Sequence, residues 1–308
     1  MTTDAGGTTI LNGNVTTTGA QTYNDAVTIA NDPTLTGKGV TFNKTVDPLN
    51  NVGSSLTVDG GSGDVTFNST IGTINNPIVN LTTKSTGTTV FSQAVSAVTL
   101  TTDGKTQVKG DVTTTGAQTY AGAVTIANNP ILTGSGITFK DTVDGNSDLT
   151  VNGGSGNITF SSAIGKTTPL TSLTANSKTS LGGNVTTTGP QTYAGAVTIA
   201  NSQILTGSDI NFNRNVDAAG NLAIAADNVN FKGIVTTTNS GTLTITNKVN
   251  LNIEKNLNLD GAFSQKGAGT VAVSGNITTT NDNISFNGPV TVKSAVSFTP
   301  GDATIAFG

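Results

Sequence analysis

Three aspartates are the residues whose type and recurrence first point to chemistry in this sequence. Asp47, Asp144 and Asp217 each end a Thr-Val-Asp or Asn-Val-Asp tripeptide. Clustered carboxylates perform acid–base hydrolysis of polysaccharides, with arginine, lysine or histidine nearby to bind a uronate and tune them. Histidine is absent here, and Arg214 is the single arginine. Because recurrence in a repeat is typical of a turn residue that bonds to backbone, we expect these aspartates to be structural.

Two glycine-rich segments have the composition of a calcium-binding turn. Gly60-Gly-Ser-Gly-Asp-Val65 and Gly153-Gly-Ser-Gly-Asn-Ile158 each resemble one unit of a nonapeptide repeat that binds calcium in tandem arrays. Calcium needs carboxylates stacked from consecutive units, whereas each segment stands alone and the second has asparagine in place of aspartate. We therefore expect tight turns, with no metal ion and no cofactor.

Threonine clusters recur along the chain and would order water if they formed one flat array. An ice-binding face of that kind needs Thr-x-Thr on every coil, but these clusters are separated by roughly 40 to 100 residues. We therefore expect them to form solvated strand surface. The clusters occupy residues 16–18, 113–115, 186–188, 236–238 and 278–280.

Aromatic and basic residues are also distributed regularly or sparsely. Tyr23, Tyr120 and Tyr193 occur once in each of three sequence repeats. An exposed tyrosine would stack on a sugar ring, but a repeated one is more typical of a core or capping position with its hydroxyl at the rim. Several lysines form no run or patch, and we expect them on solvated faces, where they hinder non-specific pairing. They are Lys38, Lys44, Lys84, Lys105, Lys109 and Lys140.

The composition of the 308-residue chain excludes several classes of chemistry. Without histidine or cysteine there is no imidazole catalysis, thiol nucleophile, disulfide or common zinc site. Only 10% of residues are charged and the net charge is −4, which argues against nucleic-acid binding because phosphate neutralisation needs clustered lysine and arginine. No apolar stretch has the length of a membrane span, and the first residues lack a signal-peptide pattern. We expect neither nucleic acid as a partner nor membrane insertion.

The candidate residues lie within an internal repeat, and the repeat defines the elements that position them. It opens at Gly13-Asn-Val-Thr-Thr-Thr and recurs at Gly110, at Gly183 and, in degenerate form, at Gly275. Self-similarity on this scale predicts a repeat architecture, here one continuous solenoid over residues 1–308. The copies occupy residues 13–109, 110–182, 183–274 and 275–308, and the last is truncated.

The unequal length of the copies indicates how the repeat is built. The first copy has 24 more residues than the second; 4 belong to a longer loop and 20 lie near residues 76–95. A globular sandwich domain cannot easily lose such a segment and keep its core, whereas a solenoid gains or loses a whole coil and restacks. We therefore expect the extra segment to form one complete coil.

Within each copy the recurring unit is an apolar-polar-apolar triplet, such as Val27-Thr-Ile29 or Val40-Thr-Phe42. This period of two predicts short strands with one buried face, and the Asn-Gly, Asp-Gly and Gly-Gly pairs between triplets predict turns. Such strands are stable when coils of about 20 residues stack them in parallel. The predicted fold is all-β, a right-handed parallel β-helix, and the alternative is a row of tandem β-sandwich modules.

The residues of the first copy also carry a family resemblance. The run from Thr18 to Asn31, continued by Leu35-Thr-Gly and Val40-Thr-Phe-Asn-Lys-Thr-Val-Asp47, resembles the repeats of filamentous-haemagglutinin-like exoproteins of two-partner secretion. The resemblance covers nearly the whole chain and fades after about Ala218. It implies a right-handed β-helical shaft, exported through an outer-membrane transporter and secreted or displayed on the bacterial cell surface. The Asn-Pro-rich signature of the family's secretion domain is missing, which favours a segment of the shaft.

We therefore expect a non-enzymatic, structural or adhesive segment of an exported surface fibre that acts as a rigid spacer or contact surface. Its predicted partners are a glycan or protein on a host or neighbouring cell, or further copies of itself. End-to-end assembly is predicted from Ile305-Ala-Phe-Gly308, a strand triplet with no polar cap. The remaining hypothesis, a carbohydrate-active β-helical enzyme, requires a single groove with clustered carboxylates.

Overall fold

The computed structural model describes residues 1–49 and 53–308, and these residues form strands and turns without any helix. Parallel strands stack in a solenoid of about 16 coils of roughly 19 residues, which confirms the predicted β-helix. Because the strand pairings are parallel, the alternative of antiparallel sandwich modules is wrong. The chain divides into two compact units, unit 1 (residues 1–157) and unit 2 (residues 158–308), and each is described by itself.

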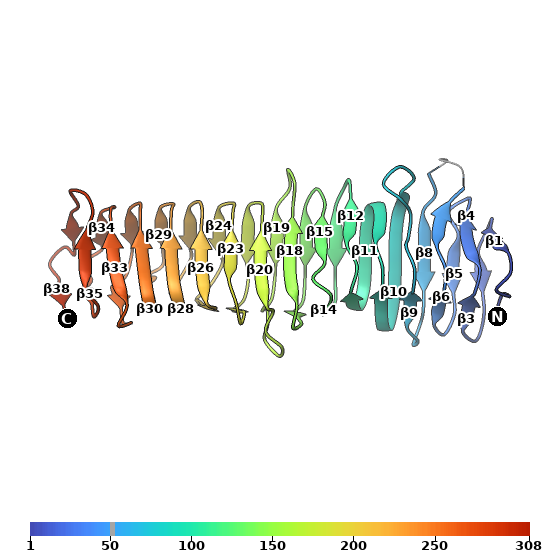
Figure 1. Cartoon of the computed structure of the whole chain (residues 1–308), viewed down its shortest axis with the longest axis horizontal. Helices are drawn as coiled ribbons and strands as arrows, with labels where there is room; N and C mark the ends of the chain where they lie inside the picture. The colour runs from blue at the N-terminus through green and yellow to red at the C-terminus, as the bar shows by residue number, and fades with distance from the viewer. Residues whose placement is uncertain (50–52) are drawn as a thin grey trace. The chain divides into compact units, whose positions relative to one another are not determined.

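Each complete coil of unit 1 contributes three strand positions, which stack into three sheets named here faces A, B and C (Figure 1). Face A contains β1 (Thr8–Leu11), β4 (Ala26–Ile29), β7 (Val46–Pro48), the start of β11 (Val95–Val108), β12 (Val112–Thr114), β15 (Ile131–Thr133) and β18 (Asp148–Asn152). Face B contains β2 (Val15–Thr16), β5 (Thr34–Thr36), β8 (Leu56–Asp59), the first part of β10 (Ile78–Phe91), the middle of β11, β13 (Gln118–Tyr120) and β16 (Ile137–Phe139). Face C contains β3 (Gln21–Tyr23), β6 (Val40–Phe42), β9 (Val65–Phe67), the ends of β10 and β11, β14 (Val124–Ile126) and β17 (Val143–Asp144).

Unit 2 likewise has three sheets, named faces D, E and F. Face D contains β19 (Ile158–Phe160), β21 (Thr179–Leu181), β24 (Val197–Ile199), β27 (Val216–Ala218), β29 (Val235–Thr237), β31 (Leu257–Leu259), β34 (Ile277–Thr279) and β37 (Phe298–Thr299). Face E contains β22 (Val185–Thr186), β25 (Gln203–Thr206), the first parts of β28 (Leu222–Phe231) and β30 (Leu243–Ile253), β32 (Phe263–Gln265), β35 (Ile284–Phe286) and β38 (Ile305–Phe307). Face F contains β20 (Ser172–Ala175), β23 (Gln191–Tyr193), β26 (Asp209–Phe212), the second parts of β28 and β30, β33 (Thr270–Val273) and β36 (Val290–Val292).

Alternation along each strand separates the core from the surface. In β6, the two apolar residues of Val-Thr-Phe are buried and the threonine between them is half-buried on the outer side. The parallel register then places similar side chains above one another inside the solenoid. The rings of Tyr23, Phe42, Phe67 and Phe91 stack in unit 1 with centroid distances of 5.1, 4.8 and 5.6 Å. A core made of such narrow columns explains how a chain with 34% hydrophobic residues folds.

Asparagine side chains at the corners join each coil to the next. Asn14 Oδ1 accepts a hydrogen bond from the backbone N of Thr34 at 2.8 Å, and Asn184 Oδ1 accepts one from Ile204 N at 2.9 Å. At another corner, Asn31 has a φ of 53°, a left-handed conformation that asparagine tolerates better than most residues. The predicted turn chemistry is therefore correct, and it also satisfies backbone amides that the strand ladders leave unpaired.

The extra residues of the first repeat form one additional coil, as predicted. Between β9 and β12 the chain passes through Ile71, two segments of β10 and three segments of β11 before it reaches β12. At the equivalent place in unit 2, it passes through Ile164, β20 and β21 before it reaches β22. The first route contains three more strand positions, which is one coil of three faces.

Equivalent motifs of the repeat lie on different faces. Val15 of the first copy belongs to β2 on face B, whereas its equivalent Val112 belongs to β12 on face A. In unit 2, Val185 of the third copy lies on face E and Ile277 of the fourth lies on face D. In both comparisons, the number of strand positions from one copy to the next is a whole number of three-strand coils minus one. A surface motif is therefore displayed on a new face each time that it recurs within a unit.

Candidate functional site

The three recurrent aspartates do not form one site. Asp47 lies in β7 on face A and Asp144 lies in β17 on face C, so the offset of the repeat places them on different faces of unit 1. Asp217 lies in β27 on face D of unit 2. Among the described residues, no group of three or more histidine, cysteine, aspartate or glutamate side chains is arranged to hold a metal ion. The clustered carboxylates that the enzyme hypothesis requires are thus not provided by these three residues.

The glycine-rich segments are turns whose glycines let adjacent coils approach closely. Gly61 has a φ of 52°, which favours glycine. A Cβ on Gly63 would lie 2.6 Å from the backbone N of Gly39 in the preceding coil, closer than real Cβ contacts allow. The carboxylate of Asp64 accepts a hydrogen bond from Thr88 N at 2.7 Å. The segment therefore serves the predicted structural role, and its aspartate holds a corner between coils.

The tyrosines lie in the core, as predicted, but their hydroxyls are buried and not at a rim. In the first copy, Tyr23 Oη donates to Gln21 Oε1 at 2.8 Å. Gln21 Nε2 donates to Thr36 O at 2.9 Å and to Thr17 Oγ1 at 3.2 Å. The second and third copies contain the same threonine–glutamine–tyrosine bonds. The Thr-x-Gly-x-Gln-x-Tyr pattern therefore encodes a buried polar network, and this network is an addition to the predicted core position.

Burial also changes the acidity of the three phenols. It raises the pKa of Tyr23 to about 12 and raises the pKa of Tyr120 and of Tyr193 well above the ordinary tyrosine value. Each phenol is therefore neutral at physiological pH and acts as a hydrogen-bond donor inside the core. None of these rings is accessible for stacking on a sugar.

The threonine clusters are divided among the faces, and their outer threonines form patches of solvated strand, as predicted. The prediction is wrong for the middle threonine of four clusters, which faces inward and is buried. In unit 1, Thr16 lies on face B and Thr113 lies on face A. In unit 2, Thr236 and Thr278 both lie on face D, where they flank Asn258 in register. The six lysines singled out above are exposed or half-buried. Face D is thus the place where two of the recurrent clusters meet.

Face F of unit 2 carries asparagines that bind one another along successive coils. In one row, Asn228 Nδ2 donates to Asp209 Oδ1 at 2.7 Å, and Asn250 Nδ2 donates to Asn228 Oδ1 at 2.9 Å. A second row, two residues further along each strand, has the same bonds with distances of 2.8 and 2.6 Å. Its members are Asn211, Asn230 and Asn252.

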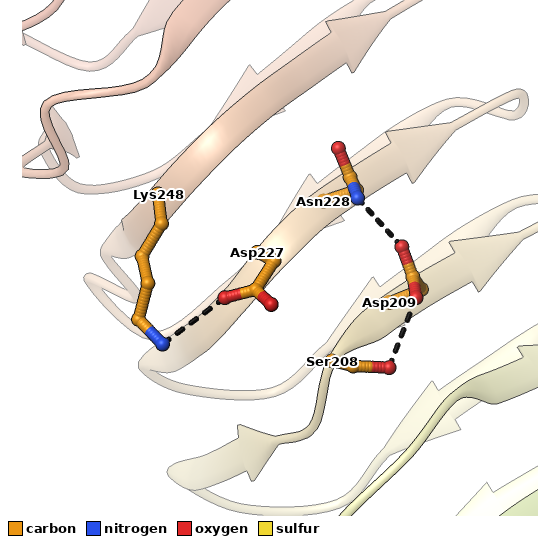
Figure 2. Close-up of polar contacts among 5 residues, drawn as sticks. All are labelled: Ser208, Asp209, Asp227, Asn228 and Lys248. Carbon is orange, nitrogen blue, oxygen red and sulfur yellow. Dashed lines mark hydrogen bonds and ion pairs between the residues drawn. The ribbon is translucent and has the colours of Figure 1, made fainter.

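The charged groups beside the first row are satisfied as well (Figure 2). The second carboxylate oxygen of Asp209 accepts a hydrogen bond from Ser208 Oγ at 2.9 Å. The Asp227 carboxylate forms an ion pair with Lys248 Nζ at 3.0 Å. The side chains of face F therefore use their hydrogen-bonding capacity on one another, and little of it is left for a ligand.

Face D has a different surface, a shallow trough that crosses five successive strands, β24, β27, β29, β31 and β34. It consists of two adjoining hollows of about 430 and about 180 Å³ that share Thr238. Threonines from β24, β29 and β34 line it, together with Asp217, Asn258 and Asp260. Ala218 and Leu259 also border it, but they face the core and are buried.

The polar side chains of the trough mostly lack partners within the chain. Asp217 is exposed, and its carboxylate has no hydrogen bond or ion pair among the described residues. The hydroxyls of Thr236 and Thr278 and the amide of Asn258 are likewise unpaired in the described part of the chain. Asp260 uses one oxygen to accept a bond from Ser240 N at 2.7 Å. The trough is therefore a candidate binding site.

The prediction that Asp217 is a turn residue is wrong, because it is the outward-facing middle residue of strand β27. The trough is not predicted from the sequence. The trough combines residues of the third copy with Thr278 and Thr280 of the fourth, and the parallel register brings them together. One signal was present: Thr236-Thr-Thr238, Asn258-Leu-Asp260 and Thr278-Thr-Thr280 each place polar residues two apart around a central inward residue. The spacing of these triplets in units of one coil would have placed them side by side.

The fold defines this chain as a β-solenoid repeat protein. Comparisons with family models, with curated proteins and with solved structures give no match for it. The part of the chain that the structure describes contains no helix long and apolar enough to cross a membrane.

Proposed function

We propose that this chain is a non-enzymatic shaft segment of an exported bacterial surface fibre, acting as a rigid spacer and contact surface. The observation that carries the proposal is the bonding between coils. Strand ladders, corner asparagines and aromatic stacks each link one coil to the next within a unit. A structure held by such local links accepts a change in length, as the additional coil of the first repeat illustrates. A spacer of adjustable length needs that property.

The resemblance of the repeats to filamentous-haemagglutinin-like exoproteins supports a location outside the cell. On this proposal the full-length protein leaves through an outer-membrane transporter, and its partner is a glycan or protein on a host or neighbouring cell. The solvated threonine surfaces supply a contact surface. Their polar composition also keeps the long sheets from associating non-specifically.

The location is tested on intact cells of the source organism with an antibody to this chain. We expect the antibody to label intact cells and brief external proteolysis to remove the label. A cytoplasmic protein serves as the control and should be labelled only after lysis. Labelling of this chain only after lysis would contradict the surface-fibre proposal.

The spacer role is tested by pulling the full chain between its ends in a force microscope. Because a coil of roughly 19 residues extends to about 65 Å, we expect repeated small steps of that order as coils detach one after another. A single large extension at low force would contradict a rigid spacer. End-to-end assembly is a separate prediction, and a molar mass that stays constant in light scattering as concentration rises would contradict it.

A further inference from the structure

We propose that the trough on face D binds a linear amino-sugar polymer, a polysaccharide whose rings carry free ammonium groups. This inference goes beyond the spacer role and concerns one surface of unit 2. A shaft without this site would still be a spacer, and a chain with this site need not be on a cell surface. The two proposals are therefore tested by different experiments, and the failure of one does not contradict the other.

The form of the trough suits a polymer. It is open along its length and crosses five parallel strands, so its ends are about 19 Å apart at the usual strand spacing. Small-molecule ligands are normally bound in enclosed cavities that bury most of their surface. An open channel that runs across successive coils instead makes the same kind of contact repeatedly, which fits a ligand built from repeated units.

The chemistry of the trough suits a sugar chain. The unpaired hydroxyls of Thr236, Thr238 and Thr278 each donate and accept a hydrogen bond, as sugar hydroxyls do. Ala218 and Leu259 face the core and are only 3% exposed, so the surface that a ligand meets consists mainly of hydroxyl, amide and carboxylate groups. An extended peptide would instead need a free strand edge, and the backbone of these strands is already paired on both sides.

The charge of the trough selects the kind of sugar. Asp217 lies in β27 and Asp260 directly follows β31, two strand positions further, a separation of about 10 Å along the trough. No lysine or arginine is among the residues that line the two hollows, and the exposed Arg214, Lys232 and Lys255 precede the first residues of β27, β29 and β31. Within the trough, an ammonium group would form a charge-assisted hydrogen bond with Asp217, whereas a uronate or sulfate group would be repelled by it.

Face F of the same unit supports this assignment by contrast. Its Asp227 is neutralised by Lys248 at 3.0 Å, and the oxygens of Asp209 accept bonds from Asn228 and Ser208. A cationic sugar bound by general attraction to an acidic protein would bind near these carboxylates as well as near Asp217. A ligand specific for the trough would depend on Asp217 and not on the carboxylates of face F.

Titration calorimetry of the full chain with a glucosamine oligomer tests the proposal. We expect saturable binding to the wild-type chain and binding at least tenfold weaker to the Asp217→Asn/Asp260→Asn double variant. The Asp227→Asn variant is the matched control, because it removes a carboxylate from face F, and it should bind as the wild type does. Circular dichroism of each variant establishes that the fold is retained.

Three further ligands define the specificity. N-acetylglucosamine oligomers and glucose oligomers lack the ammonium group and should bind at least tenfold more weakly than the glucosamine oligomer. Equal binding of either neutral oligomer would overturn the role assigned to the carboxylates. Tighter binding of polylysine, abolished by the same double variant, would overturn the assignment to a sugar. Absence of binding by the glucosamine oligomer, or binding that the double variant leaves unchanged, would overturn the proposal itself.

Discussion

Faces D and F of unit 2 are built from the same short strands but present opposite surfaces. On face F, the parallel register places asparagine over asparagine, and the amide of Asn230 bonds to both Asn211 and Asn252. On face D, the same register places Asn258 between Thr236 and Thr278, and these three side chains form no hydrogen bonds with one another. Which side chains the register places next to one another thus decides whether a polar group stabilises the solenoid or remains available to a ligand.

The largest expected losses of stability come from core variants, which test whether faces D and F both cover a well-packed core. Phe212 is buried beneath face F, between the rings of Tyr193 and Phe231 at 5.2 and 5.3 Å. Leu257 is buried beneath face D. Phe212→Ala should lower the free energy of unfolding by about 3–5 kcal/mol and Leu257→Ala by about 2–5 kcal/mol, because each leaves a cavity. Guanidinium unfolding measures both, and a negligible loss for either variant would show that one face lacks a packed core.

The next largest expected effect is a loss of stability at high pH, caused by ionisation of the buried tyrosines. Tyr193 lies beneath face F, and Tyr23 is buried in the same way in unit 1. Burial raises the pKa of Tyr23 in the folded state to about 12, from an unfolded value near 10. The neutral phenol therefore contributes its full stability below about pH 10 and loses it as the pH rises towards 12, by up to about 3 kcal/mol. We expect tyrosinate absorbance to rise together with the loss of the circular dichroism signal.

Lysines titrate in the same pH range, so a variant isolates the contribution of the phenol. Tyr23→Phe should show a smaller loss of stability between pH 10 and 12 than the wild type, because the group that titrates has been removed. Ionisation of all three tyrosines near pH 10 with the fold intact would contradict their buried, hydrogen-bonded position.

Much of the fold could be predicted from the sequence because the triplets, turn residues and additional coil each depend on local patterns. Val40-Thr-Phe42 identifies a strand by its alternation of apolar and polar residues, and the extra length of the first copy identifies one additional coil. The buried glutamine network and the trough could not be derived in this way. Gln21 meets Thr36, and Asp217 lies near Asn258, only through contacts between coils whose register the sequence does not state.

The two faces are compared most directly by replacing the same residue type on each. Asn230→Ala on face F removes two side-chain hydrogen bonds and should lower the free energy of unfolding by about 1–2 kcal/mol. Asn258→Ala on face D removes an exposed amide without a partner among the described residues and should change it by less than about 0.5 kcal/mol. Thermal and denaturant unfolding give both values. Equal losses would show that register does not distinguish the two surfaces.

The smallest expected effect separates stability from binding on face D itself. Thr236→Val and Thr278→Val remove hydroxyls that have no partner in the described chain and keep the β-branched shape that suits a strand. The free energy of unfolding should therefore change by less than about 0.5 kcal/mol. If these hydroxyls bind a ligand, the same variants should weaken glucosamine-oligomer binding while leaving the free energy of unfolding unchanged. A marked loss of stability would mean that the hydroxyls serve the fold, and the difference between the two faces would then be one of degree.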